Sequence, residues 1–207
     1  MASETDGGNG ELLFDTFDLA DIIHRVFAAG IRYDCDEGVG KVGNLDTDRL
    51  SAIPSLDCSG FVQFVLYRST FSNLKLIGGS VNQRDYCKRN FRTAVYAREA
   101  PLLDEYVRIG FRKTIPAVEA VEAAAGRPAV AEVKKKVGHV WLVINGRTYE
   151  STSKGGRGIG PKSFLWSVRK HACDYFYRLG PAPGFRRSMS DLAPMSALRS
   201  RIAGGTE

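Results

Sequence analysis

The sequence predicts an α+β domain in which N-terminal helices pack on one side of a C-terminal antiparallel sheet. Apolar residues recur at helical spacing in the first third of the chain, and from residue 128 onward they form short runs typical of strands. The dipeptide Asn145-Gly146 joins two of these runs and is the strongest short signal for a β-hairpin. A length of 207 residues with 43% apolar and 25% charged residues suits one globular domain.

The helices expected first in the chain are amphipathic. One is predicted from about Asp18 to Ala29, with Asp18 as N-cap and Gly30 as C-terminal stop. Its core stripe is Leu19, Ile22, Ile23, Val26 and Phe27. The next is predicted from Cys58 to about Ser69, and residues 34–55 between them are expected to form a long loop.

The second half of the chain is expected to change from helix to strand. Residues 75–127 are predicted to hold two or three helices, of which Pro116–Ala125 has a proline at its start and Gly126 at its end. The expected strands cover 130–133, 137–144, 147–152 and 174–179.

The domain boundaries follow from composition. Residues 1–11 are rich in glycine and acidic residues and are expected to be disordered. Residues 12–180 are expected to form a single domain with a helical insertion around 88–127. Residues 181–207 are expected to form a partly disordered tail, with a short helix near 194–202 as an alternative.

The stretch Asp57-Cys58-Ser59-Gly60-Phe61-Val62 is the most informative part of the chain. It places Cys58 where a helix is expected to begin. A helix N-terminus offers unpaired backbone N–H groups and the positive end of the helix dipole, and both favour a thiolate over a thiol. The thiolate is the nucleophilic form of cysteine, so Cys58 is a candidate nucleophile.

A histidine on the predicted hairpin is the candidate base. Gly138-His139-Val140 begins a predicted strand. A two-residue turn at 145–146 would place Glu150 diagonally across from His139, at about 7–8 Å between backbones. A carboxylate bonded to an imidazole fixes its tautomer and stabilises the imidazolium. The pattern therefore predicts Cys58 as nucleophile, His139 as proton carrier and Glu150 as the residue that orients it, with Thr152 as the substitute on the same face.

Composition and cysteine spacing restrict the other classes. A net charge of +6 permits an acidic partner without identifying one. The four cysteines are Cys35, Cys58, Cys87 and Cys173. A free Cys58 leaves an odd number, which favours reduced thiols. No Cys-x2-Cys pair occurs and His171-x-Cys173 has no matching partner motif, so no metal site is expected. No cofactor is expected either.

Targeting signals also bear on where the protein is expected. No apolar run reaches the roughly 18 residues that span a membrane, so no membrane span is expected. The N-terminus lacks a basic start and an apolar stretch, so the chain is expected to be cytoplasmic as made, with export by a specialised machine left open.

With these motifs the chain resembles the NlpC-type cysteine peptidases, papain-like enzymes that cut bacterial cell-wall peptides. The resemblance is carried by Asp57 to Val62, by Gly138-His139-Val140 and by a polar third residue one hairpin later, here Glu150. It extends upstream to Gly30-Ile31-Arg32-Tyr33 and downstream to the segment 79–86 with Gln83. It covers roughly residues 17–180. The family's third residue is more often His, Asn or Gln, and its Cys-to-His interval is usually shorter.

The resemblance implies a papain-like fold and hydrolysis of amide bonds in peptidoglycan stem peptides. It implies that Tyr33 lies near the thiol and helps to bind substrate or the oxyanion, and that Asp57 orients the peptide stem, with Ser59 beside it in the substrate site. A leaderless effector, with secretion machinery or an immunity protein as partners, or a phage-tail-like component would fit. So would a cytoplasmic recycling enzyme.

Two other readings stay open at this point. One is a non-catalytic domain of the same fold that binds wall peptide or a partner protein. The other is a nucleic-acid binder, which would need basic residues clustered on one face with aromatic residues between them. The run Lys134-Lys135-Lys136 has no aromatic neighbour, so no nucleic-acid partner is expected.

Overall fold

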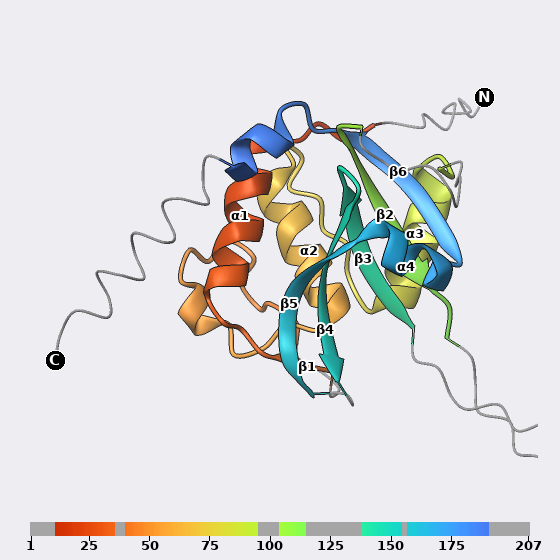
Figure 1. Ribbon diagram of the computed structural model, residues 1–207. Helices are drawn as coiled ribbons and strands as arrows, with labels where there is room; N and C mark the ends of the chain where they lie inside the picture. The colour runs from red at the N-terminus through yellow and green to blue at the C-terminus, as the bar shows by residue number, and fades with distance from the viewer. Residues whose placement is uncertain (1–10, 36–39, 95–103, 115–137, 155–156, 191–207) are drawn as a thin grey trace, which may run out of the picture.

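The computed structural model describes residues 11–35, 40–94, 104–114, 138–154 and 157–190. These residues form an α+β arrangement, as predicted, in which helices cover one face of a six-stranded antiparallel sheet (Figure 1). Apolar side chains of α1 (Thr16–Ala28) and α2 (Cys58–Ser69) pack against the sheet in the main core. A smaller apolar cluster lies on the opposite face and consists of Trp141, Val143, Trp166 and Phe176.

The two N-terminal helices follow the sequence pattern closely. The predicted stripe of α1 is buried, apart from Phe27, which is half-buried. Its N-cap is Asp15 rather than Asp18, because the Asp15 carboxylate accepts a hydrogen bond from the Asp18 N–H at 2.9 Å. The predicted bounds of α2 are confirmed. The remaining helical segments are α3 (Ser80–Asn90), α4 (Trp166–Arg169) and the 3-10 turns η1 (Leu50–Ala52) and η2 (Lys170–Ala172).

The sheet has the strand order β1-β5-β4-β3-β2-β6. The strands are β1 (Tyr33–Asp34), β2 (Tyr106–Arg112), β3 (His139–Ile144), β4 (Arg147–Lys154), β5 (Arg157–Leu165) and β6 (Tyr175–Pro181). Strand β1 pairs with β5, so the segment that leads to α2 is attached to the strand that follows the β3–β4 hairpin.

The prediction of a helical insertion around 88–127 is wrong for the part described. Helix α3 ends at Asn90, and β2 lies inside the sheet between β3 and β6. The signal that was overlooked is period-two alternation, since Val107, Ile109 and Phe111 are all buried in the main core. The expected helix at 116–125 and the expected strand at 130–133 lie outside the described residues.

Two other segments differ from the predictions. Residues 157–165 were not predicted to form a strand, but they form β5, which pairs along β4. Glycine at 160 suits this strand because φ is +88° and an added Cβ would collide with the carbonyl oxygen of Ile31. Residues 185–190, within the predicted tail, are helical. The expected helix near 194–202 and the expected disordered start at 1–10 lie outside the described residues.

The hairpin turn confirms the predicted register. Asn145 and Gly146 have φ values of 47° and 73°, the positive values that a type I′ turn requires at both central positions. The pairs Ile144–Arg147, Val143–Thr148 and Leu142–Tyr149 follow, in the predicted alignment. In that alignment Glu150 lies diagonally across from His139.

Candidate active site

Cys58 is the first residue of α2, and the residue before it builds the helix start. One carboxylate oxygen of Asp57 accepts hydrogen bonds from the Gly60 N–H at 2.5 Å and from the Ser59 hydroxyl at 3.0 Å. This N-cap satisfies the Gly60 N–H group of the first turn. The N–H group of Cys58 has no acceptor within the helix, because the donors of the first turn precede the helical ladder.

Lys41 completes this cap and was missed in the sequence. Its ammonium group forms an ion pair with the other carboxylate oxygen of Asp57 and donates to the Ser59 hydroxyl at 2.6 Å. The contacts of Asp57 and Ser59 are therefore contacts within the protein that fix the position of Cys58. The sequence offered no signal for Lys41, since it lies in a segment that was read as loop.

Two glycines let the loop between β1 and α2 approach the start of the helix. The carbonyl oxygen of Gly40 accepts a hydrogen bond from the Asp57 N–H at 2.9 Å. An added Cβ on Gly60 would collide with that same carbonyl oxygen, and Gly40 itself has φ of +82°. Glycine at position 60 of the Asp-Cys-Ser-Gly motif is thus explained by close backbone packing.

His139 lies at the start of β3, within side-chain hydrogen-bonding reach of Cys58. The two side chains come from distant parts of the sequence and are brought together by the packing of α2 on β3 and β4. Both residues are largely buried, with 6% of Cys58 and 9% of His139 exposed. The buried indole of Trp141 lies beside the imidazole, with ring centroids 5.5 Å apart.

Glu150 lies on the other side of the imidazole. The distance from His139 Nε2 to Glu150 Oε2 is 2.6 Å, so the predicted diagonal contact is present. Because Nε2 is engaged by this carboxylate, Nδ1 is the ring nitrogen left for the thiol. The alternative residue Thr152 is not needed for this contact.

Glu150 is completely buried and has two further partners. Arg169 donates from Nε to Oε1 at 2.8 Å and from Nη2 to Oε2 at 3.2 Å, and the Thr148 hydroxyl donates to Oε1 at 3.1 Å. Arg169 was missed in the sequence because it follows β5, which was itself missed. It is placed at the end of α4, and its guanidinium lies 4.2 Å from the centre of the Phe164 ring.

The surroundings shift the pKa values of the two central groups in opposite directions. Burial alone would lower the pKa of His139, but hydrogen bonds and charge from Cys58 and Glu150 outweigh it and raise the pKa. Burial alone would raise the pKa of Glu150, but His139 and then Arg169 lower it. The geometry therefore favours an imidazolium held against an ionised carboxylate.

Tyr33 lies within electrostatic reach of the Cys58 thiol. Burial, followed by the charge of Cys58 and the neighbouring Cys35, raises the pKa of the Tyr33 hydroxyl. The phenol therefore stays protonated at neutral pH and can donate a hydrogen bond. Tyr33 is placed by the pairing of β1 with β5.

Gln83 supports the helix start from α3. Its amide nitrogen donates to the carbonyl oxygens of Ser59 at 2.9 Å and Leu76 at 3.0 Å, and the side chain is fully buried. The contacts tie the first turn of α2 to the loop before α3. The role that they indicate is structural support.

The arrangement can carry out nucleophilic acyl transfer. It combines a thiol at a helix N-terminus, an imidazole in contact with it, a carboxylate on the imidazole, and nearby N–H and O–H donors. Within the described residues no group of three metal-ligating side chains gathers, and no helix is long and apolar enough to cross a membrane.

Comparison of the chain with protein family models, characterised proteins and solved structures finds no match.

Proposed function

We propose that the protein is a cysteine hydrolase that cleaves amide bonds in peptidoglycan stem peptides, with Cys58, His139 and Glu150 as its reacting unit. The observation that carries the proposal is a continuous set of contacts from the Cys58 thiol through His139 and Glu150 to Arg169. A cysteine with only a packing role would not require this set of contacts. The position of Cys58 at a helix N-terminus also supports a nucleophilic role.

The proposed reaction begins with attack of the Cys58 thiolate on the amide carbonyl carbon. The resulting oxyanion is stabilised by the Cys58 N–H and by the Tyr33 hydroxyl. The His139 imidazolium gives its proton to the amine as the C–N bond breaks, which leaves a thioester on Cys58. Water then attacks the thioester, with His139 taking its proton and returning it to the departing thiolate. Glu150 orients and stabilises the imidazolium throughout.

The choice of substrate rests on the resemblance to NlpC-type peptidases. The residues that carry it are the Asp57–Val62 motif, the Gly138-His139-Val140 strand and a polar residue one hairpin later. In a papain-like arrangement the nucleophile begins a helix and the base lies on an antiparallel sheet, and the placement of Cys58 and His139 is compatible with it. The net charge of +6 suits an anionic wall, whether the protein is a secreted effector, a phage-tail-like component or a recycling enzyme.

Digestion of purified peptidoglycan tests the proposal. Wild-type protein is expected to release stem-peptide fragments that mass spectrometry identifies, and the mass of each new terminus identifies the bond. Cys58→Ala is expected to abolish release while the fold is retained. His139→Ala is expected to reduce the rate by about 10³-fold or more, as for residues that act as one unit. His171→Ala, an exposed histidine in η2, is the matched control and should retain full activity.

The same experiment addresses the rival reading of a binding domain. If wild-type protein binds peptidoglycan but releases no fragment from any wall type, and Cys58→Ala binds equally well, the hydrolase proposal is wrong. Binding without cleavage would then be the function of this fold.

A further inference from the structure

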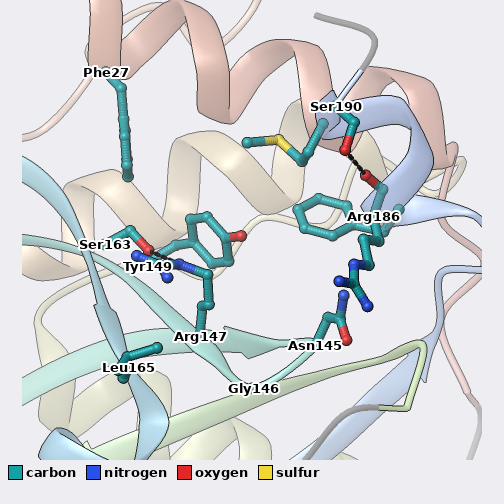
Figure 2. Close-up of a pocket in the computed structure, with 11 residues that line it drawn as sticks. Phe27, Asn145, Gly146, Arg147, Tyr149, Ser163, Leu165, Arg186 and Ser190 are labelled. Carbon is teal, nitrogen blue, oxygen red and sulfur yellow. Dashed lines mark hydrogen bonds between the residues drawn. The ribbon is translucent and has the colours of Figure 1, made fainter. Parts of the chain in front are cut away.

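A second hollow lies at the turn end of the hairpin, away from Cys58. It has a volume of about 630 Å³ and lies between the β3–β4 turn, β5, the end of α1 and the helical residues 185–190 (Figure 2). This volume is within the range of roughly 300–1,000 Å³ typical of small-molecule sites. Cys58, His139 and Glu150 are not among its lining residues.

Positive charge is concentrated in this hollow. Arg147 and Arg186 line it from different elements, and its lining includes no acidic residue. The Arg147 Nε donates to the Ser163 hydroxyl at 2.9 Å, which fixes the orientation of that guanidinium. Neither arginine forms an ion pair with any residue in the described part of the chain. Guanidinium groups that lack a protein anion are suited to bind an anionic group.

The hydroxyl of a largely buried tyrosine points into the same space. Tyr149 is only 5% exposed, and Figure 2 shows its hydroxyl directed into the space between Arg147 and Arg186. The hydroxyl forms no hydrogen bond with a residue that the structure describes. Burial raises the pKa of Tyr149 to about 12, so the group remains a donor at neutral pH. A ligand oxygen in the hollow would be in a position to accept a hydrogen bond from this donor.

The rest of the wall is apolar. Phe27 at the end of α1, Leu165 at the end of β5 and Met189 contribute side chains, and Leu165 is 54% exposed. The ring centroids of Phe27 and Tyr149 lie 6.1 Å apart, so the two rings form a continuous aromatic surface in the hollow. These surfaces suit the apolar part of a ligand whose charged group reaches the arginines.

We propose that this hollow binds an organic carboxylate with an aromatic or aliphatic body. Two guanidinium groups and the Tyr149 hydroxyl bind the carboxylate, and the apolar wall around Phe27 and Leu165 covers the body. Carboxylate is favoured over a free inorganic anion because a small anion would leave the apolar wall uncovered. The site is independent of the proposed hydrolase activity.

Titration with 4-phenylbutyrate tests the proposal on the full-length protein, with binding followed by calorimetry and by NMR shifts of the hairpin. A ligand of this size at about −0.3 kcal/mol per heavy atom has a dissociation constant in the low millimolar range. The uncharged analogue 4-phenylbutyramide is expected to bind at least about fivefold more weakly, because it lacks the ion pair. Inorganic phosphate, which carries charge without an apolar body, is expected to bind more weakly than 4-phenylbutyrate.

Substitutions locate the site. Arg147→Ala and Arg186→Ala are each expected to weaken 4-phenylbutyrate binding about tenfold, as for the loss of a charge-assisted hydrogen bond. Arg187→Ala removes the neighbouring exposed arginine, which does not line the hollow, and is the matched control with an expected change below about twofold. Tyr149→Phe keeps the ring and removes only the hydroxyl, so it should weaken binding with the fold intact.

The proposal has three ways to fail. The proposal is overturned if 4-phenylbutyrate shows no binding at concentrations up to 20-fold above about 1 mM, the scale of the dissociation constant expected from its size. Equal binding of the amide overturns the carboxylate as the recognised group. An Arg187→Ala effect as large as that of Arg186→Ala overturns the location. Cys58→Ala is expected to bind 4-phenylbutyrate as the wild type does, which separates this site from the reacting cysteine.

Discussion

Arg169 holds Glu150 by two parallel hydrogen bonds, from Nε to Oε1 at 2.8 Å and from Nη2 to Oε2 at 3.2 Å. The Glu150 carboxylate is completely buried and also contacts His139. A buried carboxylate stays ionised only when it is paired, and Arg169 supplies the fixed positive charge. In the proposed hydrolase Arg169 is therefore a positioning residue, because it contacts the imidazole only through Glu150.

Arg169→Met is expected to lower the rate of hydrolysis by about 10- to 100-fold, on the scale of the loss of a partner of an active-site carboxylate. Without Arg169 the pKa of Glu150 rises, so the acid limb of the pH–rate profile should move to higher pH. Rate measurements between pH 4 and 8 check both effects. Arg25→Met, at a half-buried helical ion pair with Asp21 far from Glu150 in the sequence, is the control. An unmoved acid limb would show that Arg169 has no influence on the ionisation of Glu150.

Glu150→Gln is expected to cost less than His139→Ala. A glutamine side chain can still accept a hydrogen bond from His139 Nε2, so orientation is kept while the charge that stabilises the imidazolium is lost. The expected loss in kcat/KM is about 10- to 100-fold. Steady-state kinetics on a synthetic stem peptide would measure it, and an unchanged rate would assign the orienting role elsewhere, with Thr152 next in line.

The stability of the fold is expected to fall as pH rises toward the alkaline range. The pKa of His139 is raised from 6.5 to about 9 in the folded protein. The imidazolium therefore favours the folded state, with a contribution that is complete below pH 6.5 and lost as pH passes through about 9. Urea unfolding at pH 6.0, 7.5 and 9.5 measures the free energy of unfolding. The decrease should be absent in His139→Gln, and equal pH dependence in both proteins would contradict the assignment.

The four thiols are expected to react with iodoacetamide at different rates at pH 7. Burial raises the pKa of Cys173 to about 12 and that of Cys87 further, so neither should be labelled. Cys35 is exposed and should be labelled. Cys58 should react fastest, and His139→Ala should slow its labelling by removing the base that pairs with the thiolate. Peptide mapping by mass spectrometry gives each rate, and labelling of Cys58 that ignores the His139 substitution would argue against the pair.

Gly60→Ala is expected to destabilise the fold. An added Cβ would collide with the Gly40 carbonyl oxygen, which is backbone and cannot rotate away. Overpacking of this kind costs about 1–3 kcal/mol in the free energy of unfolding. Gly43→Ala is the matched control, since nothing lies within 4 Å of the Cβ position there. Similar unfolding midpoints in urea for the two variants would contradict the close approach.

Local signals gave the correct elements where one short pattern decided the structure. The apolar stripe of α1, the bounds of α2 and the type I′ turn at 145–146 each depend on neighbouring residues. The alternation of β2 was overlooked because arginine and glycine stand between its apolar residues, and β5 was missed because it contains glycine and proline, which weaken a local strand signal. Pairing with other strands stabilises them instead: β2 pairs with β3 and β6, and β5 pairs with β4 and with the distant β1.

The sequence by itself determined that Cys58 begins a helix and that His139 and Glu150 share one face of a hairpin, because helix caps and two-residue turns act over a few residues. Only the tertiary structure decided that Lys41 reaches the cap and that Arg169 reaches Glu150, since each contact joins segments separated by many residues. It also decided that α2 packs where its first residue meets the imidazole. Such contacts depend on how whole elements pack, and residue spacing along the chain carries no record of that packing.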